Sequence, residues 1–115
     1  MAGISSSLTN LELRKCSVKR TGPLNYLDRL NKLTLKDNLI EDFAECEMIL
    51  RTMNQLQNLD LRGNPIVKSL KYRDQVVMLG LQLQELDYKK VMDQERRYLY
   101  NLVQQKENVA RGIPT

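Results

Sequence analysis

One spacing pattern occurs four times along the chain, and it constrains the fold more than any other feature. Its first copy, residues 8–18, has the form L-x-x-L-x-L-x-x-C-x-V, with marked residues at offsets 0, 3, 5, 8 and 10. The same offsets recur from Leu30, Leu56 and Leu83, and the fourth copy is degraded, with Tyr88 at offset 5. The copies begin 22, 26 and 27 residues apart. Periods of this length are typical of repeat proteins, whose stacked units share one core.

The spacing within each copy indicates what its residues do. Leucines two apart lie on the same face of a short strand, so Leu11 and Leu13 are expected to point into the core. The Asn or Cys three residues later stands where the chain turns away, and its side chain can satisfy backbone groups inside the turn. Asn38, Asn64 and Cys16 occupy this position. The simplest interpretation of all these residues is scaffold.

The segments between the copies predict helices on the opposite side. The sequence Asp42-Phe43-Ala44-Glu45 has the form of a capping box that opens a helix, and residues 72–80 predict a second helix that stops at Gly80. The Gly-Pro pair within residues 19–27 predicts turns or 3₁₀ structure. We expect repeats over residues 1–92, a capping helix over 93–107 with Asp93 as its N-cap, and a flexible tail over 108–115.

Composition excludes several kinds of function. The 115 residues contain no histidine, which rules out Ser-His-Asp and Cys-His nucleophiles and His-ligated zinc. The two cysteines lack CxxC spacing, phosphate-binding glycine motifs are absent, and no apolar run is long enough to span a membrane. We therefore expect no enzyme activity, cofactor, metal or membrane contact. A net charge of +4 from mostly interleaved charges also argues against direct nucleic-acid binding.

The outward strand positions form three columns when the repeats are aligned. The first is Asn10, Lys32, Asn58 and Glu85; the second is Glu12, Thr34, Asp60 and Asp87; the third is Arg14, Lys36, Arg62 and Lys89. Strands about 4.8 Å apart would stack the third column into a ladder of four cations. One interpretation is a self-compensated, solvated face. The other is a stripe that docks an acidic segment of a partner. For Asp87 we also expect a bond to backbone near the turn.

The repeat pattern is that of leucine-rich repeats, and its last part is more specific. L-R-G-N-P-I at residues 61–66, Y-R at 72–73, L-x-x-L-D at 83–87 and E-R at 95–96 resemble the leucine-rich-repeat C-terminal cap. The cap pattern is similar to that of leucine-rich regulatory subunits of protein phosphatase 1, including ciliary and testis relatives. The resemblance implies an α/β fold: a short right-handed solenoid with a parallel concave sheet of three or four strands, helices on the convex side and a C-terminal capping helix.

The same resemblance implies a non-catalytic adaptor that binds another protein by its concave face. The implied partners are a phosphatase 1 catalytic subunit or cytoskeletal proteins such as tubulin, dynein and other axonemal components. The expected location is then cytoplasmic, with the cytoskeleton or a cilium as more specific alternatives. The cap also occurs in the leucine-rich subunit of the U2 small ribonucleoprotein. The alternative function is therefore a ribonucleoprotein subunit.

The first repeat departs from the family pattern, because members usually carry more repeats and an N-terminal cap. Leu8, Leu11 and Leu13 are therefore expected on an unpaired edge strand, which promotes aggregation when uncovered. Three explanations remain open: the chain is the tail of a longer product, a partner supplies the missing layer, or the edge pairs with a second copy.

Overall fold

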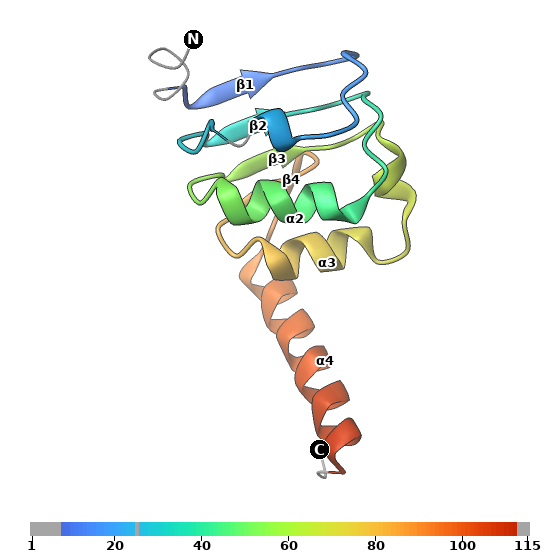
Figure 1. Ribbon diagram of the computed structural model, residues 1–115. Helices are drawn as coiled ribbons and strands as arrows, with labels where there is room; N and C mark the ends of the chain where they lie inside the picture. The colour runs from blue at the N-terminus through green and yellow to red at the C-terminus, as the bar shows by residue number, and fades with distance from the viewer. Residues whose placement is uncertain (1–7, 25, 113–115) are drawn as a thin grey trace.

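The computed structural model describes residues 8–24 and 26–112, which form a short coil whose turns each add one strand to a sheet (Figure 1). The parallel strands are β1 (Asn10–Glu12), β2 (Lys32–Thr34), β3 (Asn58–Asp60) and β4 (Glu85–Leu86). Leu11 pairs with Leu33, Leu33 with Leu59, and Leu59 with Leu86. The repeat offsets therefore set the register, and the predicted solenoid is confirmed.

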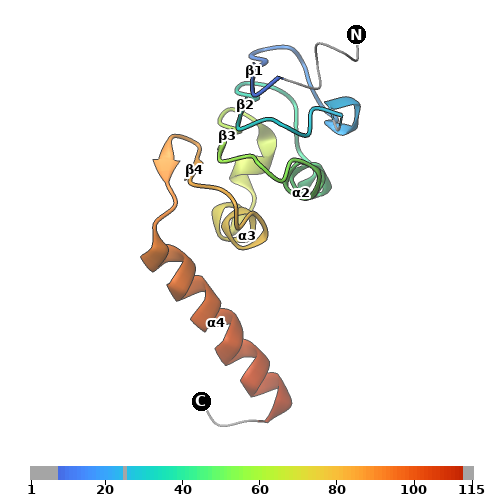
Figure 2. The ribbon, with the colours of Figure 1, turned by 90° about the vertical axis from the view of Figure 1, so that its left-hand side faces the viewer.

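The chain returns between strands on the opposite side of the core (Figure 2). The return segments are η1 (Gly22–Leu24), α2 (Phe43–Thr52), η2 (Pro65–Lys68) and α3 (Tyr72–Leu79). The strand leucines and the inner faces of α2 and α3 form one apolar cluster, in which Leu33, Leu35 and Val76 are completely buried. Each unit thus buries its leucines against its neighbours, as a stacked-layer fold requires.

The asparagines at offset 8 link neighbouring repeats. The Asn38 side-chain oxygen accepts from the backbone N–H of Cys16 and Val18, at 2.9 and 3.0 Å. Asn64 accepts from the N–H of Ile40 at 3.0 Å and donates to the carbonyl of Leu35 at 2.8 Å. Each asparagine therefore satisfies backbone groups of the preceding repeat as well as its own, as the scaffold interpretation predicts.

The ends of α2 and α3 lie where the sequence predicts them, and the difference concerns the role of Glu45. Asp42 is the N-cap of α2, and its carboxylate accepts from the N–H of Ala44 at 3.0 Å, as predicted. Glu45 does not complete the capping box. Its carboxylate instead accepts from the hydroxyl of buried Thr21 at 3.0 Å and from the same residue's N–H. Glu45 therefore ties the first return segment to α2. Helix α3 ends at Gly80, as predicted.

The fourth repeat differs from the prediction. Asp87 and Tyr88 have φ angles of 54° and 67°, so the chain reverses after β4 and forms an antiparallel strand, β5 (Lys89–Lys90). Consecutive residues with positive φ are what a two-residue hairpin requires. Tyr88 was predicted to fill an inward leucine position, but its side chain is 64% exposed. The sheet therefore has a fifth strand beyond the predicted parallel ones.

The last helix, α4, spans Asp93–Arg111 and begins after Met92, so Asp93 is its first residue and not its N-cap. The helix continues four residues past the predicted end at 107, into the predicted tail; residues 113–115 of that tail lie outside the described part of the chain. Its proximal half packs on α3, where Leu99 is buried. Its distal half projects beyond the last repeat (Figures 1 and 2).

Candidate protein-binding surface

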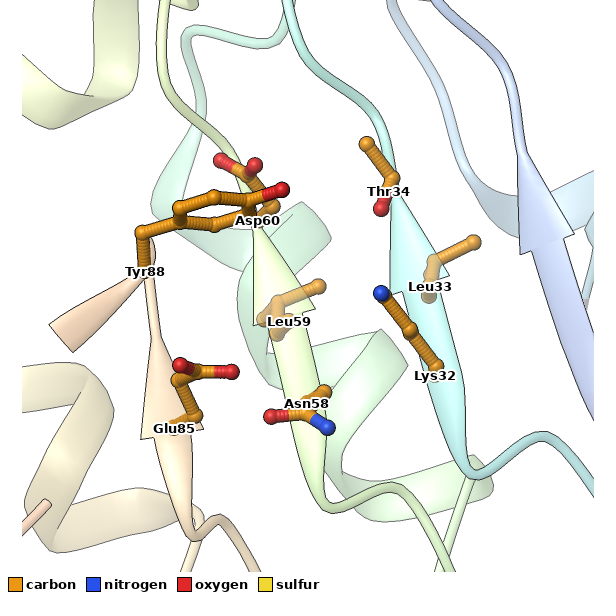
Figure 3. Close-up of a pocket in the computed structure, with 8 residues that line it drawn as sticks. All are labelled: Lys32, Leu33, Thr34, Asn58, Leu59, Asp60, Glu85 and Tyr88. Atoms are coloured by element: carbon orange, nitrogen blue, oxygen red, sulfur yellow. The ribbon is translucent and has the colours of Figure 1, made fainter. Parts of the chain in front are cut away.

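The outward columns are only partly exposed. Asn10, Glu12 and Lys32 are exposed, whereas Asn58 and Glu85 are half-buried. Thr34 and Asp60 were predicted to face solvent, yet each is only 4% exposed. They lie at the centre of the concave sheet, where neighbouring strands and the β4–β5 turn surround them (Figure 3). The centre of the concave face therefore consists of buried, closely packed polar side chains.

A small hollow lies at this centre. Figure 3 shows its lining, with Tyr88 standing beside Asp60 on one side and Lys32 and Thr34 on β2 on the other. Its volume is about 10 Å³, which is room for about one water molecule. Pockets that bind drug-sized molecules usually measure about 300 Å³ or more. The hollow therefore suits the tip of a side chain from another protein and not a small-molecule ligand.

Three side chains form a fixed cluster beside the hollow. The Arg62 guanidinium donates to both carboxylate oxygens of Asp60, through Nε at 3.0 Å and Nη2 at 2.8 Å. Its other contact is the Tyr88 ring, whose centroid lies 4.1 Å from Cζ. Burial alone would raise the pKa of Asp60, but the side-chain and backbone hydrogen bonds from Arg62 hold the pKa below its usual value. Tyr and Arg held in this way are the residue types enriched at interface hot spots.

The four-cation ladder does not form. Lys89 lies on β5, past the chain reversal, and so it does not stack with the other three. Arg14 pairs with Glu12, and Arg62 pairs with Asp60. Lys36 remains between them, and within the described residues it makes no ion pair closer than 4.0 Å. Glu85, on the same face, makes no such ion pair either. The face is thus largely self-compensated, with a small excess of positive charge from Lys32 and Lys36 over Glu85.

Asp87 does not belong to the surface. Its carboxylate turns inward and accepts from the N–H of Leu61 at 2.6 Å and from the hydroxyl of Tyr72 at 2.9 Å. Burial raises the pKa of Asp87, although these two hydrogen bonds oppose the shift. Burial likewise raises the pKa of Tyr72 above its usual value. The predicted bond from Asp87 to backbone is confirmed, and its role is structural.

The remaining cap residues hold α4 in place. The Arg73 guanidinium donates to the Glu95 carboxylate at 2.8 Å and to the carbonyl of Leu86 at 3.2 Å. Arg96 donates to the carbonyls of Val77 and Gly80, at 2.7 and 3.2 Å. The Y-R and E-R parts of the cap pattern therefore join the last strand, α3 and α4. This arrangement accounts for their joint appearance in the sequence.

The sequence did not identify Tyr88 as part of the concave face. The signal was the tyrosine itself, because the other three copies carry leucine at offset 5. An apolar groove of about 150 Å³ between the end of α3 and α4 was not predicted from the sequence either. It is lined mainly by Met78, Leu81, Tyr100 and Val103.

The predicted edge strand is present. Leu8, Leu11 and Leu13 pack against the core but remain half-buried, and among the described residues no strand pairs with the outer side of β1. No described helix is both long and apolar enough to span a membrane. No cluster of three or more potential metal-ligating acids or cysteines occurs in the described ranges.

Comparison with solved structures shows the fold. The leucine-rich-repeat domain of Mex67 from Chaetomium thermophilum is similar, with a TM-score of 0.68, 23% identity, and coverage of 82% of this chain and 66% of that one. The Drosophila melanogaster SNF/U2A′ complex contains another similar chain, with a TM-score of 0.63, 16% identity, and coverage of 98% and 79%. At these identities the likeness establishes a leucine-rich-repeat fold and nothing more.

Comparison with curated proteins finds partial matches, and no family model matches the chain. The mouse (Mus musculus) centrosomal protein of 72 kDa is 36% identical over 93 residues, which are 80% of this chain and 14% of that protein. The U2 small nuclear ribonucleoprotein A′ of Saccharomyces cerevisiae is 30% identical over 83 residues, with coverage of 72% and 35%. That of Neurospora crassa is 37% identical over 84 residues, with coverage of 73% and 32%. The chain thus spans about a third or less of these relatives.

These names correct one expectation. The predicted cytoplasmic location, with the cytoskeleton or a cilium as alternatives, is wrong, because the U2 relatives are proteins of a small nuclear ribonucleoprotein. Their names point to the nucleus. None of the relatives named above is a phosphatase subunit, so the resemblance to phosphatase 1 regulators stays a prediction.

Proposed function

We propose that this chain is a non-catalytic adaptor that holds a segment of another protein against its concave face. The arrangement of Arg62 between Asp60 and Tyr88 carries the proposal. A bidentate ion pair and a stacked ring fix the guanidinium before any partner arrives. Binding then costs little side-chain entropy at this position.

The charges of the face favour a partner segment with carboxylates. Lys32 and Lys36 lie on the same face and are not neutralised by a described ion pair. Arg62 remains about one-third exposed while it pairs with Asp60. A carboxylate approaching this row meets cations on two adjacent strands, and opposite charge both orients the encounter and speeds it. The hollow beside Tyr88 would receive one small side chain.

The protein class that the comparisons favour is a subunit of a small ribonucleoprotein of the U2 type. One observation supports it: the identity to U2 A′ proteins of several fungi. The partner would be a protein component of the particle. The identity to the mouse centrosomal protein favours a second candidate, a subunit of a centrosomal type of assembly. Phosphatase 1, tubulin and dynein remain predicted partners without such support.

Capture from nuclear extract with the tagged chain tests the function, with and without nuclease. We expect protein components of a ribonucleoprotein to be retained after nuclease treatment, because the contact is with protein. Recovery of centrosomal proteins, tubulin or phosphatase 1 would replace the first candidate. Loss of all bound protein on nuclease treatment would contradict an adaptor of either class.

A paired variant then tests the surface. Arg62→Ala combined with Tyr88→Ala should weaken binding of the captured protein by about 100-fold or more, which is typical of two hot-spot residues. The matched control is Arg51→Ala with Gln75→Ala, which changes two exposed polar side chains on the convex helices. Equal affinity of both variants and the parent chain would place the binding site elsewhere.

A further inference from the structure

The first layer of the coil leaves its strand leucines less covered than those of the layers that follow. Leu33 and Leu35 of the second repeat are completely buried, whereas Leu11 and Leu13, at the same offsets in the first repeat, are half-buried. The residues are chemically the same and lie in register. The difference arises because no described layer covers the outer flank of β1.

Among the described residues, no other strand pairs with the backbone of this flank. Thr9, Leu13 and Lys15 direct their backbone groups toward the second repeat: the Thr9 carbonyl accepts from Lys32, and the N–H groups of Leu13 and Lys15 donate to Thr34 and Lys36. In a parallel pair, alternate residues bond to the same neighbour. The intervening residues Asn10, Glu12 and Arg14 therefore direct their N–H and C=O groups outward, where the Arg14 carbonyl accepts from the exposed Cys16 thiol at 3.2 Å.

This edge is held in a fixed shape. The N–H groups of Cys16 and Val18, just past the strand, are bound by the Asn38 side chain. The carbonyl of Leu13 accepts from the same amide at 2.6 Å. These bonds hold the edge in order before any association. Lys15, with a φ of 53°, turns the chain out of the extended line, so the part of the edge that can pair ends at Arg14.

The side chains on the edge are self-complementary. Glu12 and Arg14 are both about half-exposed and stand two residues apart on the concave side. In an antiparallel pair centred on Leu13, Glu12 of each strand lies opposite Arg14 of the other. Both residues have outward backbone groups, so this register also forms hydrogen-bonded pairs. Charges on an edge strand often prevent pairing, but opposite charges in this order favour it.

We infer that two copies of this chain associate through β1, antiparallel about a two-fold axis at Leu13, so that their sheets become continuous and their leucine cores meet. Like a typical two-fold interface, the contact uses the same surface from each copy. The two shorter dimensions of the molecule are 26 and 23 Å. An end face of that size is roughly 500 Å², so two faces bury about 1,000 Å², near the lower limit of specific interfaces. The dimer is therefore weak and depends on concentration.

Sedimentation equilibrium of the full chain over a range of concentrations tests the inference. We expect a monomer–dimer equilibrium. Glu12→Arg and Arg14→Glu should each raise the dimer dissociation constant about tenfold or more, because each creates two like-charge contacts. The combined variant should return to within about threefold of the parent value, because it restores both opposite-charge contacts with the signs exchanged. Glu47→Arg is the matched control, since it disrupts the exposed Glu47–Arg51 pair away from the edge and should leave the dimer unchanged.

Crosslinking tests the register. In this pairing the two Leu13 residues face each other at a non-hydrogen-bonded position, where Cα atoms are about 4.5 Å apart and a disulfide can form. Leu13→Cys in a Cys16→Ser background should crosslink on mild oxidation, and Cys16→Ser alone should not. A chain that stays monomeric at all concentrations overturns the inference. A dimer whose dissociation constant is the same in the Glu12→Arg and Arg14→Glu variants as in the parent chain also overturns it.

Discussion

Replacing Asn64 tests the idea that offset-8 asparagines hold the repeats together. Asn64 is 1% exposed, and its side chain is the bonding partner of the Ile40 N–H. Its side-chain amide also donates to the carbonyls of Leu35 and Leu61. Each carbonyl keeps a second donor when this amide is removed: the Asn38 side chain for Leu35, and the backbone N–H of residue 64 for Leu61. Asn64→Ala therefore leaves one buried donor unpaired, at about 1–3 kcal/mol, and removes two bonds worth about 0.5–1.5 kcal/mol each. We expect a total loss of about 2–6 kcal/mol.

Urea unfolding followed by circular dichroism at 222 nm measures this loss. The total stability of a small domain is about 5–15 kcal/mol, so the midpoint should fall clearly while the denaturant slope stays the same. Asn54→Ala is the control, because Asn54 is exposed and such a change usually alters stability by no more than about 0.5 kcal/mol. A loss below about 1 kcal/mol for Asn64→Ala would refute the assignment of a linking role to this side chain.

Two further predictions concern the cap and one turn. Asp87→Asn should be at least as stable as the parent chain at pH 7, because the amide can keep both hydrogen bonds without a buried charge. The pKa of Asp87 is raised in the folded state, so the parent chain should gain stability relative to the variant as the pH falls through that pKa. Urea denaturation of both chains at pH 7 and pH 4 checks the sign. A difference in free energy of unfolding that is the same at both pH values would contradict the prediction. Gly63→Ala should cost about 2 kcal/mol or more, because its φ is +80° and a Cβ would lie 2.0 Å from the Asp37 carboxylate. Thermal melts should show a smaller loss for Gly112→Ala, which has φ +74° and open space.

The sequence was sufficient to predict features that depend on local spacing. Leu33 and Leu59 could be placed inward, and Asn38 and Asn64 at the turns, because strand alternation and the repeat period act within a few residues. Asp42 was recognisable as a cap for the same reason. The exposure of Thr34 and Asp60 could not be predicted in this way. Their burial depends on how the sheet curves and on where Tyr88 lies. Both are set by contacts between residues that are distant in the sequence.

The unpredicted turn after β4 also explains how the end of the solenoid and its concave face are connected. The Asp87 carboxylate is drawn inward by the Leu61 N–H and the Tyr72 hydroxyl, so the chain cannot continue as another parallel strand. It reverses, and the reversal places the Tyr88 ring over Arg62. The bonds that terminate the repeats thus also position the aromatic side chain of the proposed binding surface. The degraded fourth copy is therefore better understood as a cap that contributes to the site than as a repeat that has lost its pattern.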